Sequence, residues 1–162
     1  MARLRRVQSP IEVVTVIGAT VETVFDLELD VDAHAASLPG TGETATTSTG
    51  RSTLGLGDEV TFRARHFGIR WTMTTKVTVH ERPHRFVDEQ VRGPFRSLRH
   101  EHVFEVHDGT STRMTDRMDI ALPLGPPGKA AVRFVLIPYM RRLLQRRACN
   151  IKREAERITD VD

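Results

Sequence analysis

Residues 98–118 read LRHEHVFEVHDGTSTRMTDRM, two runs of alternating side chains separated by Asp108-Gly109. An Asp-Gly pair between two such runs is a strong signal for a tight β-hairpin. In each run, one set of alternate positions is dominated by arginine, glutamate and aspartate, which indicates a face exposed to water. The other set must then face the interior of the protein.

The same two-residue period extends outward from this hairpin over residues 41–122. Turn signals separate the runs, which predict strands over residues 44–49, 58–67, 69–81, 85–92, 95–107 and 111–122. Consecutive strands joined by short turns indicate an antiparallel meander, curved enough to enclose something. One more strand, rich in β-branched residues, is predicted over residues 9–17.

Helical spacing appears on both sides of the meander. Thr20 is the expected N-cap of a helix that starts at Val21, and residues 33–38 predict a second short helix after an interruption at residues 30–32. Residues 129–158 predict a long C-terminal helix with a kink near residues 134–138 caused by Pro138. Its apolar stripe contains Val132, Val135, Leu136, Tyr139, Met140, Leu143, Leu144, Arg147 and Ile151. Because a long helix must bury such a stripe, we expect it to lie across the concave face of the sheet.

Several ionisable side chains fall on the face that the alternation turns inward. Asp88, His100, His102 and Asp116 all do so, although both alternate sets of the strand 85–92 are mixed. A solid core would not contain so many polar groups, because each is costly when buried without a partner. These side chains therefore either bond one another across neighbouring strands or line a wet cavity.

Apolar and aromatic side chains surround these polar positions, as in a pocket for a small molecule. The predicted ligand-binding residues are Phe62, His66, Trp71, Phe86, Gln90, Leu98, Phe104, Met114, Met118, Leu136, Tyr139 and Met140. Tyr139 fits either a polar anchor for a ligand or a core aromatic residue with a satisfied hydroxyl, and the second interpretation is favoured.

The order of elements resembles the helix-grip fold of the START-like or SRPBCC superfamily, in particular its bacterial polyketide cyclase/dehydrase branch. The matching stretches are residues 19–26, 93–95, 100–104, 114–116 and 123–125. The resemblance covers nearly the whole chain. It implies an α+β fold in which a curved antiparallel sheet, of about seven strands, wraps around the C-terminal helix. It also implies a hydrophobic ligand between sheet and helix, with roles that range from binding or transfer to cyclisation of a poly-β-ketone.

Composition restricts the class of protein. The chain has 162 residues, of which 39% are hydrophobic and 28% charged, and a single cysteine, Cys149. These values indicate one globular domain over residues 1–162, without a disulfide framework or a cysteine-based zinc site. We expect Cys149 to be a packing residue of the last helix. No apolar run approaches the ~20 residues of a membrane span, so we expect a cytoplasmic protein without stable membrane insertion.

The net charge of +3 is unevenly distributed. Residues 127–162 contain nine basic and four acidic residues, whereas residues 7–126 carry a net negative charge. The only aromatic residues of the basic segment, Phe134 and Tyr139, both fit an apolar helix face, so we do not expect a nucleic acid as partner. Its cations are interpreted as a solvent-facing helix side, the alternative being a surface for an anionic membrane or partner. They are Arg141, Arg142, Arg146, Arg147, Lys152 and Arg153.

Two functions fit the inward polar residues. In the first, the protein binds a small hydrophobic ligand, and the histidines and aspartates bond its polar end or one another. In the alternative, the protein is a cyclase or dehydratase of the lyase type, in which histidine is the general acid or base and aspartate orients it. The candidate catalytic residues are then Asp88, His100, His102 and Asp116. The sequence favours the first function.

The His-x-His spacing of His100 and His102 also occurs in zinc sites that include a carboxylate. The resemblance implies no metal, and we expect neither a metal nor another cofactor. Whether the chain forms a homodimer stays open.

Overall fold

The structure, a computed structural model, describes residues 11–121 and 132–160. Its seven strands form one antiparallel sheet in the order β1-β7-β6-β5-β4-β3-β2. The strands are β1 (Ile11–Ile17), β2 (Thr44–Thr47), β3 (Glu59–His66), β4 (Ile69–Glu81), β5 (Arg85–Arg92), β6 (Ser97–Val106) and β7 (Thr112–Ala121). The predicted meander is confirmed; the predicted strand residues 9, 10 and 122 lie outside the described residues.

Two short helices follow β1. In α1 (Val21–Glu28), the hydroxyl of the N-cap Thr20 accepts a hydrogen bond from Thr23 N at 3.3 Å. The predicted interruption at residues 30–32 is wrong, because α2 (Val31–Ala36) begins there. Asp30 is its N-cap and accepts from Ala33 N at 2.9 Å, the usual role of an aspartate before a helix.

The C-terminal helix changes from a π-helical to an α-helical conformation next to Pro138. A π-helical turn, η1 (Val132–Leu136), precedes α4 (Ile137–Thr159), and Pro138 lies in the first turn of α4. A proline is tolerated there because its missing N–H would have no partner within the helix. The irregularity predicted for residues 134–138 is therefore a π-helical turn. The predicted helical residues 129–131 lie outside the described residues.

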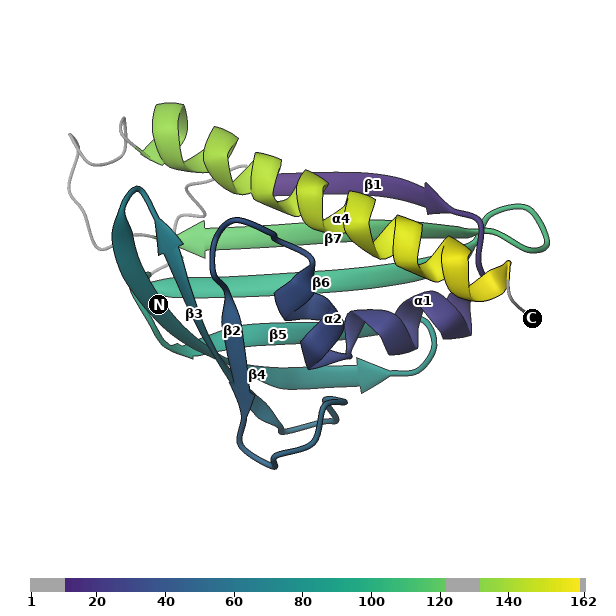
Figure 1. Ribbon diagram of the computed structural model, residues 1–162, viewed down its shortest axis with the longest axis horizontal. Helices are drawn as coiled ribbons and strands as arrows, with labels where there is room; N and C mark the ends of the chain where they lie inside the picture. Colours follow the sequence, from purple (N-terminus) through teal and green to yellow (C-terminus); the bar gives the residue numbers. More distant parts are fainter. Residues whose placement is uncertain (1–10, 122–131, 161–162) are drawn as a thin grey trace, which may run out of the picture.

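α4 lies across the concave face of the sheet, and its two halves have different surroundings (Figure 1). In the C-terminal half, Ala148, Ile151 and Ala155 are buried in the main hydrophobic core with α1 and strands β1, β6 and β7, and Leu144, nearer the middle of the helix, contacts both this core and the cavity. The alanines let the helix approach the sheet closely. The N-terminal half lines a cavity instead. The same helix therefore covers a solid core at one end and a cavity at the other.

Burial confirms which alternate positions of β6 and β7 face inward. Leu98, His100, His102 and Phe104 are buried on β6, as are alternate residues of β7 from Thr112 to Ile120. Two residues depart from this pattern, since Val106 beside the hairpin turn is exposed and Thr115, which alternation turns outward, is buried.

Three expectations for the last helix are wrong. Val135 is exposed, because the π-helical turn carries it off the stripe counted at 3.6 residues per turn. Cys149 is exposed, since its neighbour Ala148 occupies the packing position. Arg147, which belongs to the predicted stripe, points inward to Glu43, so its interpretation as a solvent-facing cation is wrong. None of the helices in the described ranges is long and apolar enough to span a membrane.

Candidate ligand cavity

A cavity of about 400 Å³ lies between the concave face of the sheet and the N-terminal half of α4. Side chains from β3, β4, β5 and β6 form one wall, and α4 forms the opposite wall with Tyr139, Met140, Leu143 and Leu144. This volume is within the range of small-molecule sites in proteins. Most of the wall is aliphatic or aromatic, which favours an apolar occupant.

Most of the predicted ligand-binding residues line this cavity. They are Phe62, His66, Trp71, Phe86, Leu98, Met118, Leu136, Tyr139 and Met140. These residues were predicted from the alternation of side chains along the strands and from the helical spacing in the last helix.

Three predicted ligand-binding residues are not in the described wall. Gln90 turns its side chain to the next loop, where it donates to Phe95 O at 2.8 Å and accepts from Phe95 N at 3.3 Å. Phe104 and Met114 face inward, but they are opposite each other on β6 and β7 in the solid core. There the ring of Phe25 on α1 meets Phe104 edge to face at 5.4 Å.

Strand register brings together the four candidate catalytic residues. Asp88 is opposite His100, and His102 is opposite Asp116. His102 Nδ1 lies 2.9 Å from Asp116 Oδ1, and His102 Nε2 lies 3.4 Å from Asp88 Oδ1. His100 approaches the same two oxygens at 3.4 Å through Nε2 and at 3.9 Å through Nδ1. Asp88, His100 and His102 line the cavity, whereas Asp116 lies behind them.

The two histidines of this cluster have opposite pKa shifts. Burial opposes a charge on His102, but its contacts with Asp116 and Asp88 outweigh burial and raise its pKa to about 10. Burial lowers the pKa of His100, and the neighbouring His102 charge lowers it further. At neutral pH His102 is therefore charged and His100 is neutral.

The pKa values of two acidic side chains beside these histidines, Asp116 and Glu28, are also shifted in opposite directions. Burial raises the pKa of Asp116, yet the two imidazoles reverse this and hold it well below its ordinary value. Glu28 of α1, which also lines the cavity, lies 3.9 Å from His102 Nδ1. Burial and the charge of Asp116 raise the Glu28 pKa to about 7.

His100, His102 and Asp88 also offer three ligand atoms within 4.8 Å of one another, close enough to hold a metal ion.

A second polar group in the wall was missed by the sequence analysis. Arg147 Nη2 is 3.0 Å from Glu43 Oε1, and Arg147 Nε donates to Ser37 Oγ at 3.1 Å. His34 lies 3.9 Å from the same Glu43 oxygen and packs against Phe62, with ring centroids 4.6 Å apart. Burial and then the Arg147 charge keep the His34 pKa well below its ordinary value. The place of Arg147 on the apolar stripe of the last helix was the feature of the sequence from which its inward orientation could have been predicted.

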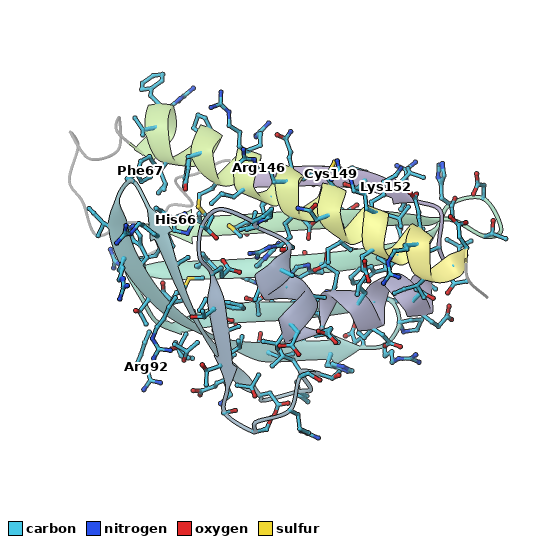
Figure 2. The ribbon with its side chains drawn as sticks, in the orientation of Figure 1. His66, Phe67, Arg92, Arg146, Cys149 and Lys152 are labelled. Carbon is cyan, nitrogen blue, oxygen red and sulfur yellow. The ribbon has the colours of Figure 1, made fainter. Side chains whose placement is uncertain are left out.

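The cavity reaches the protein surface at the β3–β4 hairpin. Phe67 lines it and is 58% exposed. The neighbouring His66 Nδ1 and Tyr139 OH are 2.6 Å apart, and the rings of Phe67 and Tyr139 pack at a tilt of 42° with centroids 4.4 Å apart. Figure 2 shows His66 and Phe67 close to the N-terminal end of the last helix. The expected satisfied hydroxyl of Tyr139 is present, and the same residue also lines the cavity.

Comparison with known proteins assigns the sequence to a family. The profile of the family described as polyketide cyclase / dehydrase and lipid transport matches residues 10–156. No curated protein sequence matches the chain.

Solved structures share the fold at low sequence identity. The Zhui aromatase/cyclase from Streptomyces sp. R1128 has a TM-score of 0.76 at 17% identity, over 92% of this chain and 94% of that one. A START superfamily protein from Mycobacterium smegmatis has a TM-score of 0.67 at 15% identity, over 92% and 98%. The protein TTHA0849 from Thermus thermophilus has a TM-score of 0.70 at 17% identity, over 88% and 97%. These similarities establish the helix-grip fold.

Proposed function

Because the chain belongs to the polyketide cyclase / dehydrase and lipid transport family, we propose that it binds a small hydrophobic molecule of lipid-, polyketide- or aromatic-like chemistry. The observation that carries this proposal is the cavity of about 400 Å³ between the sheet and α4, whose wall is largely apolar. A preformed apolar cavity stabilises a ligand that removes its own apolar surface from water.

The polar groups of the wall suit one end of such a ligand. Thr75 Oγ1 lines the cavity and is buried near the Asp88 carboxylate, but it makes no well-aligned hydrogen bond within the described residues. A buried hydroxyl without a partner is costly, so a ligand carbonyl or hydroxyl that bonds it would gain affinity. The expected ligand is therefore apolar over most of its length and carries an oxygen at one end.

Trp71 provides the test, because it is the only tryptophan of the chain and lines the cavity. We expect 1-aminoanthracene, a neutral aromatic probe, to change the emission of Trp71 saturably with one site per chain. Ala64 is paired with Trp71 in the β3–β4 register and also lines the cavity. The larger side chain of Ala64→Phe should occupy part of the cavity and weaken binding at least tenfold, as judged by the probe's own fluorescence. Val106→Phe, a change at an exposed site outside the described wall, is the matched control and should bind like the original protein. An unsaturable signal, or equal binding by Ala64→Phe, would count against the proposal.

A second candidate function, cyclisation of a poly-β-ketone, is favoured by the opposite pKa shifts of His100 and His102. Two neighbouring groups with pKa values pushed apart are suited to be base and acid in one reaction. Neutral His100 would remove a proton from a carbon between two carbonyls. The resulting carbanion would form a carbon–carbon bond to a distant carbonyl carbon, and His102 would protonate the carbonyl oxygen.

Near-isosteric variants separate the two functions. If the protein is an enzyme, His100→Gln and His102→Gln lose turnover of a poly-β-ketone but keep the binding that Trp71 reports. If these variants weaken binding and the original protein shows no turnover, binding alone is the function.

A further inference from the structure

Three donor atoms converge at the cavity wall. Asp88 Oδ1 lies 3.4 Å from His102 Nε2 and 3.9 Å from His100 Nδ1, and each of the three residues offers one donor atom within 4.8 Å of the other two. Ligand atoms around a tetrahedral ion with bonds of about 2.0 Å are about 3.3 Å apart. Small rotations of the side chains would therefore bring the three donors to coordination distance.

The remaining ring nitrogens of both histidines face one carboxylate. Asp116 Oδ1 lies 2.9 Å from His102 Nδ1 and 3.4 Å from His100 Nε2. Histidines that bind a metal through one nitrogen usually direct the other toward a carboxylate or carbonyl, which fixes the tautomer and the ring orientation. Both of these nitrogens are buried, and in the present ring orientations their contacts with Asp116 are ion-pair contacts rather than well-aligned hydrogen bonds. An ion on the opposite nitrogens would place a proton on each of them.

The charge of the cluster also favours a cation. Asp88 and Asp116 make ion pairs with imidazoles only, and no lysine or arginine of the described residues pairs with either. Carboxylates with so little exposure are found paired with cations or bound to metals. A divalent ion would balance the two carboxylates while both imidazoles stay neutral.

The ion would be reached from the cavity. Asp88, His100 and His102 line the cavity, whereas Asp116 does not, so the free coordination positions face the ligand space. The geometry points to a binding site for one divalent first-row transition metal ion, held by Asp88 Oδ1, His100 Nδ1 and His102 Nε2. Two imidazoles and a carboxylate suit zinc, iron(II) or cobalt(II) better than magnesium or calcium. This inference does not depend on the proposed hydrophobic ligand.

Cobalt(II) is the probe for this site, because its visible absorption reports the donor atoms. The full chain is treated with a chelator, dialysed and titrated with Co²⁺ in a Cys149→Ser background, since a thiol on the surface binds metals by itself. We expect saturation at one equivalent without a sulfur-to-cobalt charge-transfer band, and displacement of Co²⁺ by Zn²⁺. Asp88→Asn and His102→Gln should each weaken binding at least tenfold, whereas His107→Gln, which alters an exposed histidine outside the cavity wall, should leave it unchanged. Absence of saturable binding, or equal loss in His107→Gln, would overturn the inference.

A measurement without substitutions covers variants that fail to fold. In ¹⁵N spectra of the imidazoles of the original protein, Zn²⁺ should shift His100 Nδ1 and His102 Nε2 and leave the other nitrogen of each ring protonated. Shifts confined to other histidines, or none, would place the ion elsewhere or exclude it. Either result leaves the Trp71 titration untouched, so the metal site and the hydrophobic ligand can fail separately.

Discussion

Asp116 holds two imidazoles through one carboxylate oxygen, at 2.9 Å from His102 and 3.4 Å from His100. Both rings are buried, and they are close, with centroids 3.8 Å apart. Phe86 stacks on His102 from the other side at 4.1 Å. Because two adjacent imidazoles repel each other when both are charged, one of them stays neutral, and the shorter contacts of His102 with Asp116 and Asp88 select it as the charged one.

The first prediction concerns the protonation of His102 in the metal-free protein. Its folded pKa of about 10 exceeds the ordinary value of 6.5, so ¹⁵N spectra should show both ring nitrogens protonated at pH 8. The contribution of His102 to stability is fully present below pH 6.5 and is lost as the pH rises through about 10. A His102 that titrates near 6.5 would contradict the described contacts.

At the scale of elements, a two-residue turn positions the cavity opening. His66 is paired with Ile69, and Phe67 and Gly68 between them have φ angles of +53° and +74°. A tight hairpin of this kind needs positive φ at both positions, which glycine adopts without strain. The turn holds Phe67 against Tyr139 of α4.

The second prediction follows from the Gly68 backbone. A Cβ at Gly68 would contact nothing within 4 Å, so the cost of Gly68→Ala is that of its backbone conformation. We expect a loss of about 1 kcal/mol in the free energy of unfolding, measured by urea denaturation. Gly55→Ala is the control, since Gly55 has no positive φ and a Cβ there makes ordinary contact with Asp58. Equal losses in both variants would contradict the assignment.

The third prediction concerns the link between α4 and the segment before β2. Arg147 contacts Glu43, whose side chain is only 6% exposed. Removing one partner of a buried ion pair leaves the other charge uncompensated. Arg147→Met should therefore destabilise the protein by about 3 kcal/mol, and adding Glu43→Leu should recover part of the loss. A double variant as unstable as the sum of the single variants would show that the pair does not interact.

The shared inward face of the polar cluster is predictable from the sequence, but its exact pairing and the contacts of the second polar group are not. Alternation places His102 and Asp116 on the same face, but a two-residue turn at Asp108-Gly109 would pair His102 with Thr115, whereas the observed register is centred on Gly109 and puts His102 opposite Asp116. Nothing comparable fixes α2 against the sheet. The meeting of His34, Glu43 and Arg147 depends on how α2 and α4 pack, and sequence periodicity does not specify it.

At the scale of the whole molecule, the inward face is divided into a solid end and a hollow end. Alternation places Phe104, Met114 and Met118 on the same face, yet only Met118 reaches the cavity. The difference arises from α1, whose Phe25 fills the space beside Phe104. Which part of a concave sheet is filled depends on the volumes of side chains from distant elements, so the predicted ligand-binding residues included some core residues.

This division separates stability from binding. Substitutions in the solid end, such as Phe104→Ala, should cost about 3–5 kcal/mol of stability, whereas enlarging Ala64 should mainly affect ligand binding.

Native mass spectrometry of freshly purified protein shows whether the cavity holds a ligand. We expect the original chain and Val106→Phe to carry, or to take up from an added panel of fatty acids and aromatic polyketide-like compounds, one small hydrophobic molecule per chain. Ala64→Phe should carry none or much less. The proposed ligand binding is contradicted if no compound binds in a one-to-one ratio, or if Ala64→Phe retains the same amount as the original protein.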